Sequence, residues 1–204
     1  MITIVNYGLG NIKAFANIYN KLNVPCIIAT NASVLEKADK IILPGVGAFD
    51  HAMEQLDSSG MRSTLNQMVL EKKIPVLGIC VGMQMLAHSS DEGTLPGLGW
   101  VNGTVKKFDS EKLHHTTHLP HMGWNDVKPL KQSDLFFDLE THACFYFLHS
   151  YYFSCNNSSD ISAVTDYGGA FTCAVQYENI FGVQFHPEKS HHYGIQLLKN
   201  FANL

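Results

Sequence analysis

The sequence predicts an α/β fold, with an open, mostly parallel sheet flanked by helices and an added antiparallel patch. In the first half of the chain, short apolar runs alternate with segments of helical periodicity, which is typical of βαβ units. In the second half, strand-like runs follow one another closely, which favours antiparallel pairing. We find no internal repeat and no linker-like boundary, so we expect residues 1–204 to form a single domain.

The first half is expected to end in a strand that runs into a glycine-rich turn. Apolar runs predict strands over Ile2–Asn6, Val24–Ala29, Lys40–Leu43 and Ile74–Leu77. Helical spacing predicts helices over Asn11–Lys21, Ala48–Leu56 and Met61–Glu71, with a further helix-like segment over Met85–His88. This alternation places successive strands in one parallel sheet.

The second half supplies the expected antiparallel strands. They are Trp100–Phe108, Ala143–Phe153, Phe171–Glu178 and Ile180–Phe185. The pair Glu178-Asn179 lies where a tight turn would join the last two strands. A helix over His191–Ala202 closes the chain.

Composition narrows the functional class. A net charge of −4 without a dense Lys/Arg cluster gives no reason to expect nucleic acid as a partner. The longest apolar stretch, Ile74–Ala87, is shorter than the roughly 20 residues of a membrane span and contains glycines. The five cysteines are odd in number and form no Cys-x-x-Cys pair, which is typical of reduced thiols. The N-terminal residues form an expected strand rather than a signal peptide. We therefore expect a cytoplasmic protein that does not enter membranes.

Cys80 is the first candidate catalytic residue. It stands between Gly78 and Gly82, after an apolar run and before a helix-like segment. A cysteine in an apolar run is most often a small buried hydrophobe. Here, however, the flanking glycines allow a tight turn, and the start of a helix favours a thiolate over a thiol. The same layout presents the serine nucleophile of α/β-hydrolases.

A thiolate that attacks a carbonyl also needs hydrogen-bond donors for the oxyanion. The N–H of Val81 would point toward an oxyanion formed beside Cys80. Gly47 follows the expected strand Lys40–Leu43 in a loop of small residues, so its backbone can approach a substrate closely. We interpret Gly47 as the second donor. Whether these donors are preformed is left open by the sequence.

The segment His186-Pro187-Glu188 supplies a base and its orienting partner. His186 and Glu188 are two residues apart in a segment expected to be extended, so both side chains would project from one face. Pro187 favours extended backbone at His186. Taken alone, His-Pro-Glu is more often an ordinary strand-end turn. Together with Cys80 it favours a thiol triad in which Glu188 fixes the His186 tautomer.

A set of motifs along the chain resembles the class I (triad) glutamine amidotransferases. The motifs are Asn6-Tyr7-Gly8-Leu9-Gly10-Asn11, Pro44-Gly45-Val46-Gly47-Ala48-Phe49, Gly78-Ile79-Cys80-Val81-Gly82-Met83-Gln84, Pro120-His121-Met122-Gly123-Trp124-Asn125 and Phe185-His186-Pro187-Glu188-Lys189-Ser190. Within that class, the first and fourth motifs are similar to those of the glutaminase subunits of imidazole glycerol phosphate synthase. The resemblance covers essentially the whole chain and implies the fold of that class.

The resemblance implies hydrolysis of L-glutamine through a glutamyl thioester on Cys80, without a cofactor or metal. The ammonia would pass through a tunnel to a (β/α)₈ cyclase partner, which makes imidazole glycerol phosphate and aminoimidazole carboxamide ribotide in histidine biosynthesis. The residues implied to hold glutamine are Gly47, Gln84, Glu92 and the Ser150-Tyr151 backbone. Those implied to face the partner in a heterodimer are Asn11, Trp124 and Lys189.

Three other functions stay open at this point. Trp100, in the segment Gly97–Gly103, stands where an aliphatic residue is common, and this segment resembles paralogues that supply ammonia for surface sugars such as lipopolysaccharide or nonulosonic acid. A non-catalytic regulatory subunit would keep the fold, but the intact Cys80, His186 and Glu188 speak against it. A stand-alone cysteine hydrolase acting on another amide is the third.

Two further patterns are weaker. Gly8-Leu9-Gly10 after a strand begins like a dinucleotide fingerprint, but Lys13 stands where the third glycine belongs. Four histidines, His114, His115, His118 and His121, lie close together in sequence. No cysteine or glutamate geometry accompanies them, so we interpret them as a histidine-rich surface loop rather than a metal site.

Overall fold

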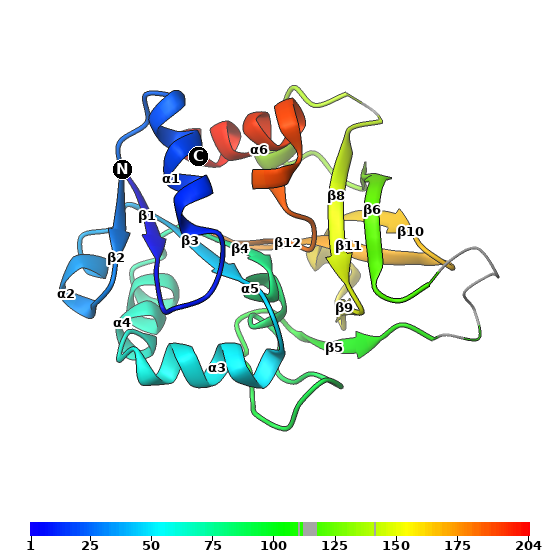
Figure 1. Cartoon of the computed structure of the whole chain (residues 1–204), viewed down its shortest axis with the longest axis horizontal. Coiled ribbons are helices and arrows are strands. Elements are labelled where there is room, and N and C mark those ends of the chain that lie inside the picture. Colours follow the sequence, from blue (N-terminus) through cyan, green and yellow to red (C-terminus); the bar gives the residue numbers. More distant parts are fainter. Residues whose placement is uncertain (110, 112–117, 141) are drawn as a thin grey trace.

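A computed structural model describes residues 1–109, 111, 118–140 and 142–204, and these residues are arranged around one large mixed sheet (Figure 1). Its main path runs in the order β2 (Cys26–Ala29), β1 (Ile2–Val5), β3 (Lys40–Gly45), β4 (Val76–Cys80), β12 (Ile180–Val183), β11 (Ala170–Tyr177), β10 (Ile161–Asp166) and β7 (Lys128–Pro129). The pairs from β2 to β12 are parallel and those beyond β12 are antiparallel. The predicted α/β class is confirmed, with a larger antiparallel part than expected.

The antiparallel part has a branch and a separate sheet. Strand β9 (Tyr151–Cys155) pairs with β11 and with β5 (Gly103–Lys107), while β6 (His121–Asp126) and β8 (Cys144–His149) form a two-stranded sheet. The predicted single strand over Ala143–Phe153 is therefore wrong. The chain changes sheets at Ser150, because its two halves pair with different partners.

Helices cover the parallel part of the sheet. They are α1 (Ile12–Lys21), α2 (Ala32–Leu35), α3 (Phe49–Ser58), α4 (Arg62–Asn66), α5 (Val81–Gln84) and α6 (His191–Asn203). A π-helical turn over Gln67–Glu71 continues α4, and short 3-10 turns cover Asp134–Phe136, Ser158–Asp160 and Pro187–Lys189. The prediction of a helix-like segment at Met85–His88 is wrong in position. The chain turns directly after Cys80, so Met85 already caps the end of α5.

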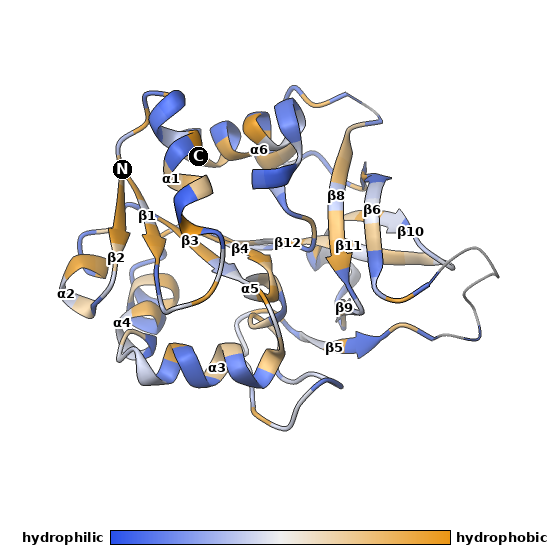
Figure 2. Ribbon diagram, viewed as in Figure 1, coloured by the Kyte–Doolittle hydropathy of each residue, from blue (hydrophilic) through white to orange (hydrophobic). Residues whose placement is uncertain are grey.

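The apolar residues of these elements form a continuous core. Figure 2 shows apolar residues on the strands of the large sheet and alternating apolar and polar bands along α3. On α3 the residues at helical spacing, Ala52, Met53 and Leu56, are fully buried. Of the helices that the structure describes, none combines the length and apolar character needed to cross a membrane.

Three adjacent parallel strands place the candidate site. In β3, β4 and β12, Gly45 pairs with Cys80 and Val183 pairs with Ile79. The segments that follow the three strands therefore emerge side by side at the carboxyl edge of the sheet, which is where α/β folds bind ligands. The tight turn predicted at Glu178-Asn179 joins β11 to β12, with Tyr177 paired to Ile180. Strand β12 then runs parallel to β4 and leads the chain to the carboxyl edge.

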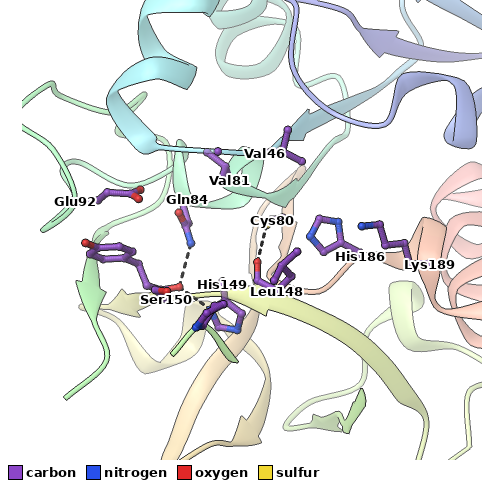
Figure 3. A pocket seen from close by; sticks show the side chains of 13 residues that line it. Val46, Cys80, Val81, Gln84, Glu92, Leu148, His149, Ser150, His186 and Lys189 are labelled. Carbon is purple, nitrogen blue, oxygen red and sulfur yellow. Dashed lines mark hydrogen bonds between the residues drawn. The ribbon is translucent and has the colours of Figure 1, made fainter. Parts of the chain in front are cut away.

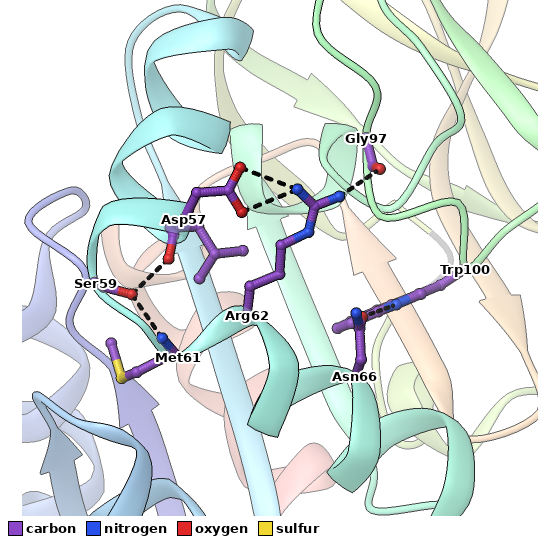
Figure 4. Close-up of polar contacts among 8 residues, drawn as sticks. Asp57, Ser59, Met61, Arg62, Asn66, Gly97 and Trp100 are labelled. Atoms are coloured by element: carbon purple, nitrogen blue, oxygen red, sulfur yellow. Dashed lines mark hydrogen bonds and ion pairs between the residues drawn. The ribbon is translucent and has the colours of Figure 1, made fainter.

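Trp100 anchors a loop to α4 (Figure 4). Its side chain is 4% exposed, and its Nε1–H donates to Asn66 Oδ1 at 2.9 Å. Arg62, on the same helix, binds the Asp57 carboxylate at 2.9 and 3.0 Å and donates to the Gly97 carbonyl at 3.3 Å. Trp100 thus has a structural contact that accounts for its presence in the Gly97–Gly103 segment.

We predict that Trp100→Phe lowers the free energy of unfolding by about 1–2 kcal/mol, because it removes a largely buried hydrogen bond and some packing. The matched control is Trp124→Phe at the 48%-exposed tryptophan, where the change should stay within about 0.5 kcal/mol. Urea unfolding of both variants measures the difference, and equal losses would contradict the anchoring role.

Candidate active site

Cys80 occupies the turn between β4 and α5 in a backbone conformation that few non-glycine residues adopt. Its φ of 54° and ψ of −112° lie outside the common regions, a strain of order 1–3 kcal/mol that is found mainly at functional sites. The neighbouring glycines serve a different purpose from the one expected. Gly78 and Gly82 keep negative φ, but a Cβ on Gly82 would lie 2.0 Å from the Leu43 carbonyl oxygen. They allow close packing, while Cys80 itself makes the turn.

A pocket of about 300 Å³ opens at Cys80 (Figure 3). Its walls contain most of the side chains and backbone predicted to form the site: Gly47, Cys80, Val81, Gln84, Glu92, Ser150, Tyr151, His186 and Lys189. Figure 3 shows Glu92 on one side of the pocket and His186 and Lys189 on the other, with Cys80 between them. The volume suits a small molecule that would extend from Glu92 to the thiol.

His186 is held between a thiol and a carboxylate. Its Nδ1 lies 3.0 Å from Glu188 Oε1, with both side chains buried, and the ring lines the same pocket as Cys80. Because a carboxylate only accepts hydrogen bonds, Nδ1 carries a proton and Nε2 faces the thiol. The expectation that Glu188 lies in an extended segment is wrong. Pro187 begins a 3-10 turn over Pro187–Lys189, which still brings the carboxylate to the ring.

The charge of His186 follows from these contacts. Burial alone would lower the pKa of His186, but its interactions with Cys80 and with the Glu188 carboxylate raise it to about 10. A protonated histidine beside a cysteine is the pairing of a thiol nucleophile with its proton donor. The arrangement can therefore supply a nucleophile and an acid at neutral pH.

Two backbone groups lie where oxyanion donors were predicted. Val81 is the first residue of α5, so its N–H has no acceptor within the helix. Gly47 follows Gly45, which pairs with Cys80 in the sheet, and has a φ of 87° that a side chain would disfavour. The start of α5 adds the positive end of a short row of peptide dipoles.

Gln84 and the Ser150-Tyr151 backbone form one wall. The amide Nε2 of Gln84 donates to the Tyr151 carbonyl at 3.1 Å and to Gln184 Oε1 at 3.1 Å. The Ser150 carbonyl accepts a hydrogen bond from the Phe108 N–H at 3.2 Å. Of the backbone groups of this segment, only the N–H groups are donors and so suit an anionic ligand.

Glu92 is held by a reciprocal arrangement with α3. Its carboxylate accepts a hydrogen bond from the N–H of Phe49, the first residue of α3, at 2.9 Å. Asp50 in turn accepts hydrogen bonds from the N–H groups of Thr94 and Leu95 at 2.9–3.1 Å. These backbone N–H groups lower the pKa of Asp50, so its carboxylate is charged at neutral pH. Glu92 therefore enters the pocket from a fixed turn.

The residues predicted to face a partner are exposed along one rim. Trp124 is 48% exposed on β6 and stacks on His191 with ring centroids 5.0 Å apart. Lys189 lies in the 3-10 turn beside β8, with its Nζ 5.6 Å from the centre of the Tyr146 ring. Asn11 is exposed at the start of α1, which packs against the same turn.

The histidine interpretation is wrong for His121. This residue begins β6, is 3% exposed, and its Nδ1 lies 3.1 Å from His149 Nε2. His118 is exposed, whereas His114 and His115 lie outside the described residues. Over residues 1–109, 111, 118–140 and 142–204, no group of three His, Cys, Asp or Glu side chains is arranged to hold a metal ion. Each of the five cysteines is a free thiol.

Sequence reasoning missed two buried residues beside the nucleophile. Gln184 donates from Nε2 to Cys80 Sγ at 3.8 Å, and His149 donates from Nδ1 to the Tyr151 carbonyl at 2.7 Å. Gln184 could have been found, because it precedes His186 by two residues and so shares its face of an extended segment. His149 could not, since its place depends on where β8 ends.

The chain was compared with known proteins. The family model for class I glutamine amidotransferases matches residues 3–203. The imidazole glycerol phosphate synthase subunit HisH of Bdellovibrio bacteriovorus is 59% identical, and that of Leptospira interrogans 53% identical, each over 100% of both chains. Among solved structures, a glutamine amidotransferase superposes with a TM-score of 0.75 at 15% identity, covering 100% of this chain and 99% of that one. PurLQS from Thermotoga maritima gives 0.74 at 16% identity, covering 99% and 97%. The two solved structures show likeness of fold.

We predict that the His186 ring keeps both nitrogens protonated near pH 8, and that Glu188→Gln lowers its titration midpoint by about one unit or more. The native pKa of about 10 lies above the ordinary value of 6.5. Protonation therefore stabilises the fold fully below pH about 6.5, and this contribution is lost as the pH rises through about 10. Nitrogen NMR of labelled histidine measures the protonation state of the His186 ring and its titration midpoint in both proteins. His149, whose pKa burial lowers to about 3, is the internal control and should stay neutral. A neutral His186 at pH 7 would contradict the charge assignment.

Proposed function

Because this chain belongs to the class I glutamine amidotransferases, and within them to the HisH subunits of imidazole glycerol phosphate synthase, we propose that it hydrolyses glutamine with Cys80, His186 and Glu188 as a catalytic triad. The observation that carries the proposal is the buried His186–Glu188 pair at 3.0 Å beside a cysteine held at positive φ. The complete triad speaks against a purely regulatory subunit. We also propose that residues 1–204 act as one domain in the cytoplasm.

The chemistry begins with attack of the Cys80 thiolate on the side-chain amide carbon of glutamine. The carbonyl oxygen becomes an oxyanion, which the N–H of Val81 and a second donor at Gly47 stabilise. His186 gives its Nε2 proton to the nitrogen, the C–N bond breaks, and ammonia leaves a glutamyl thioester. Proton transfer of this kind contributes roughly 10²–10⁴-fold in rate.

Hydrolysis of the thioester regenerates the site. Neutral His186 removes a proton from a water molecule, and the hydroxide adds to the thioester carbon. The second tetrahedral intermediate uses the same oxyanion donors as the first. Its collapse breaks the C–S bond, releases glutamate and returns the thiolate beside the imidazolium. Glu188 keeps the ring in one tautomer through both steps.

The rest of the pocket would orient the amino-acid end of glutamine. The Glu92 carboxylate suits the α-ammonium group, and Gln84 lies between it and Cys80 (Figure 3). The N–H groups of Ser150 and Tyr151 suit the α-carboxylate, because an N–H donates and a carboxylate accepts hydrogen bonds. A substrate bound at both of its charged groups presents its amide to the thiolate in one orientation.

We place the ammonia-consuming partner, a (β/α)₈ cyclase, on the rim formed by Asn11, Trp124 and Lys189. Lys189 belongs both to this rim and to the pocket wall, so the rim adjoins the place where ammonia is released. In a heterodimer the ammonia would be channelled to the synthesis of imidazole glycerol phosphate and aminoimidazole carboxamide ribotide. The HisH relatives, 59% and 53% identical over the whole chain, favour this acceptor over the surface-sugar alternative.

We predict that Cys80→Ala abolishes release of glutamate from glutamine, with and without a purified cyclase subunit. Wild-type activity should rise when the cyclase and its nucleotide ligand are both present, because the partner would cover the rim beside Lys189. The measurement is a coupled glutamate assay, with Cys26→Ala as the matched control that should retain full activity. Activity that survives in Cys80→Ala would refute the mechanism, and robust activity of the chain alone that no partner changes would favour a stand-alone hydrolase.

We predict that Glu92→Gln raises KM for glutamine roughly 10–100-fold with little change in kcat. The substitution keeps an acceptor for the Phe49 N–H but removes the charge that pairs with the α-ammonium group, a charge-assisted bond of about 1.5–3 kcal/mol. Glu54→Gln, at an exposed position of α3, is the control and should behave as wild type. A fall in kcat at unchanged KM would contradict this role.

A further inference from the structure

The carbonyl of Tyr151 sets the direction of a buried hydrogen-bond chain. It accepts from Gln84 Nε2 at 3.1 Å and from His149 Nδ1 at 2.7 Å. A carbonyl oxygen can accept hydrogen bonds but never donate one. Gln84 must therefore turn its amide nitrogen, and not its oxygen, toward Tyr151. His149 must carry its proton on Nδ1.

The direction passes from Gln84 to Gln184. The same Gln84 nitrogen donates to Gln184 Oε1 at 3.1 Å, which fixes the oxygen of Gln184 on that side. The Gln184 nitrogen then lies on the opposite side, where it is 3.8 Å from Cys80 Sγ. Gln184 is 0% exposed and Gln84 is 2% exposed, so water cannot easily offer a partner to a reversed amide.

The second arm of the chain supports the same direction. His149 Nε2, free of a proton, accepts from His121 Nδ1 at 3.1 Å, and His121 Nε2 lies 3.4 Å from Asn125 Nδ2. That amide nitrogen also donates to the Asp166 carbonyl at 2.7 Å, so Asn125 presents a nitrogen to His121. Every polar atom along both arms has one consistent role.

We propose that Gln184 is a further catalytic residue of this site, which donates its side-chain N–H to the Cys80 thiolate and is held in that orientation by Gln84 and the Tyr151 carbonyl. The proposal rests on the proposed function, since it concerns the nucleophile of that reaction. Sheet register explains the placement. Val183 pairs with Ile79, so the next residue of the chain, Gln184, comes level with Cys80. His186, two residues further, supplies the positive charge.

The other groups around Cys80 leave this donor a distinct task. Tyr7 is buried beside Cys80, but its hydroxyl donates to the Pro44 carbonyl at 2.7 Å. His149 is a neutral ring committed to Tyr151, and Glu188 acts through His186. When His186 gives its proton to the leaving ammonia, the sulfur is part of the thioester and no longer carries a negative charge. Gln184 would therefore matter most in the two steps in which the sulfur is a thiolate, its attack on the amide carbon and its departure from the second tetrahedral intermediate.

The test measures alkylation of Cys80 by iodoacetamide against pH, read by mass spectrometry, in Gln184→Met and Gln184→Glu. Methionine removes the donor at similar volume, and the rate at pH 7 should fall about two- to tenfold. Glutamate keeps the shape but brings a negative charge to the sulfur, and the fall should be larger. In glutamine hydrolysis, kcat should fall with little change in KM.

Two controls keep the outcome decisive. Cys173 is 0% exposed and should stay unreactive in every variant that has folded. If both variants expose Cys173, the wild-type chain is used instead: the side-chain amide signals of Gln184 in an NMR spectrum should shift as Cys80 ionises, and should not shift in Cys80→Ala. An unchanged alkylation profile in a folded variant, or amide signals insensitive to Cys80, would overturn the proposal. Because alkylation requires no glutamine, failure of the proposed hydrolysis would be seen separately, as activity remaining in Cys80→Ala.

Discussion

The site depends on the close approach of α5 to the strands beneath it. A Cβ on Gly82 would lie 2.0 Å from the Leu43 oxygen, and one on Gly45 would lie 2.4 Å from the Gly82 nitrogen. Because glycines at positions 45 and 82 leave no side chain between these backbones, α5 can pack against the strands and begin directly after β4. The chain therefore changes direction at Cys80, which has a φ of 54°. The same contact leaves the Val81 N–H without an acceptor inside the helix and places Gln84 one helical turn from the thiol. One packing constraint thus sets the nucleophile, an oxyanion donor and a wall of the pocket.

Two sheets, rather than one, complete the pocket. The carboxyl edges of β3, β4 and β12 bring together Gly47, Cys80 and His186 from distant parts of the sequence. The small sheet of β6 and β8 closes the opposite side, and the chain crosses from it into the large sheet at Ser150. Since the β6–β8 sheet also carries the exposed Trp124, a partner bound there would touch the element that ends at the pocket wall.

The parts of the site that could be predicted are those set by local sequence. The turn at Cys80 could be predicted from glycines between a strand and a helix, although Cys80 itself makes it. The proximity of His186 and Glu188 could be predicted from their spacing, although a 3-10 turn and not an extended segment brings them together. The break at Ser150 could not be predicted, because Cys144–His149 and Tyr151–Cys155 share one alternating apolar pattern and only their distant partners differ. Burial of His121 has the same origin, since it depends on pairing between β6 and β8. Features set by neighbouring residues could be predicted, whereas the passage of the chain from one sheet to the other could not.

Three histidines near the pocket show how contacts decide charge where burial is shared. Burial is the main cause that lowers the pKa of His121 to about 4 and that of His149 to about 3. His186 is also buried, yet its pKa rises to about 10 because its partners are a thiol and a carboxylate. Neutral rings can pass one hydrogen-bond direction from Asn125 to Tyr151, which a charged ring would interrupt by donating from both nitrogens. The pocket therefore combines a charged His186, which transfers a proton, with neutral His121 and His149, which orient the amide of Gln184.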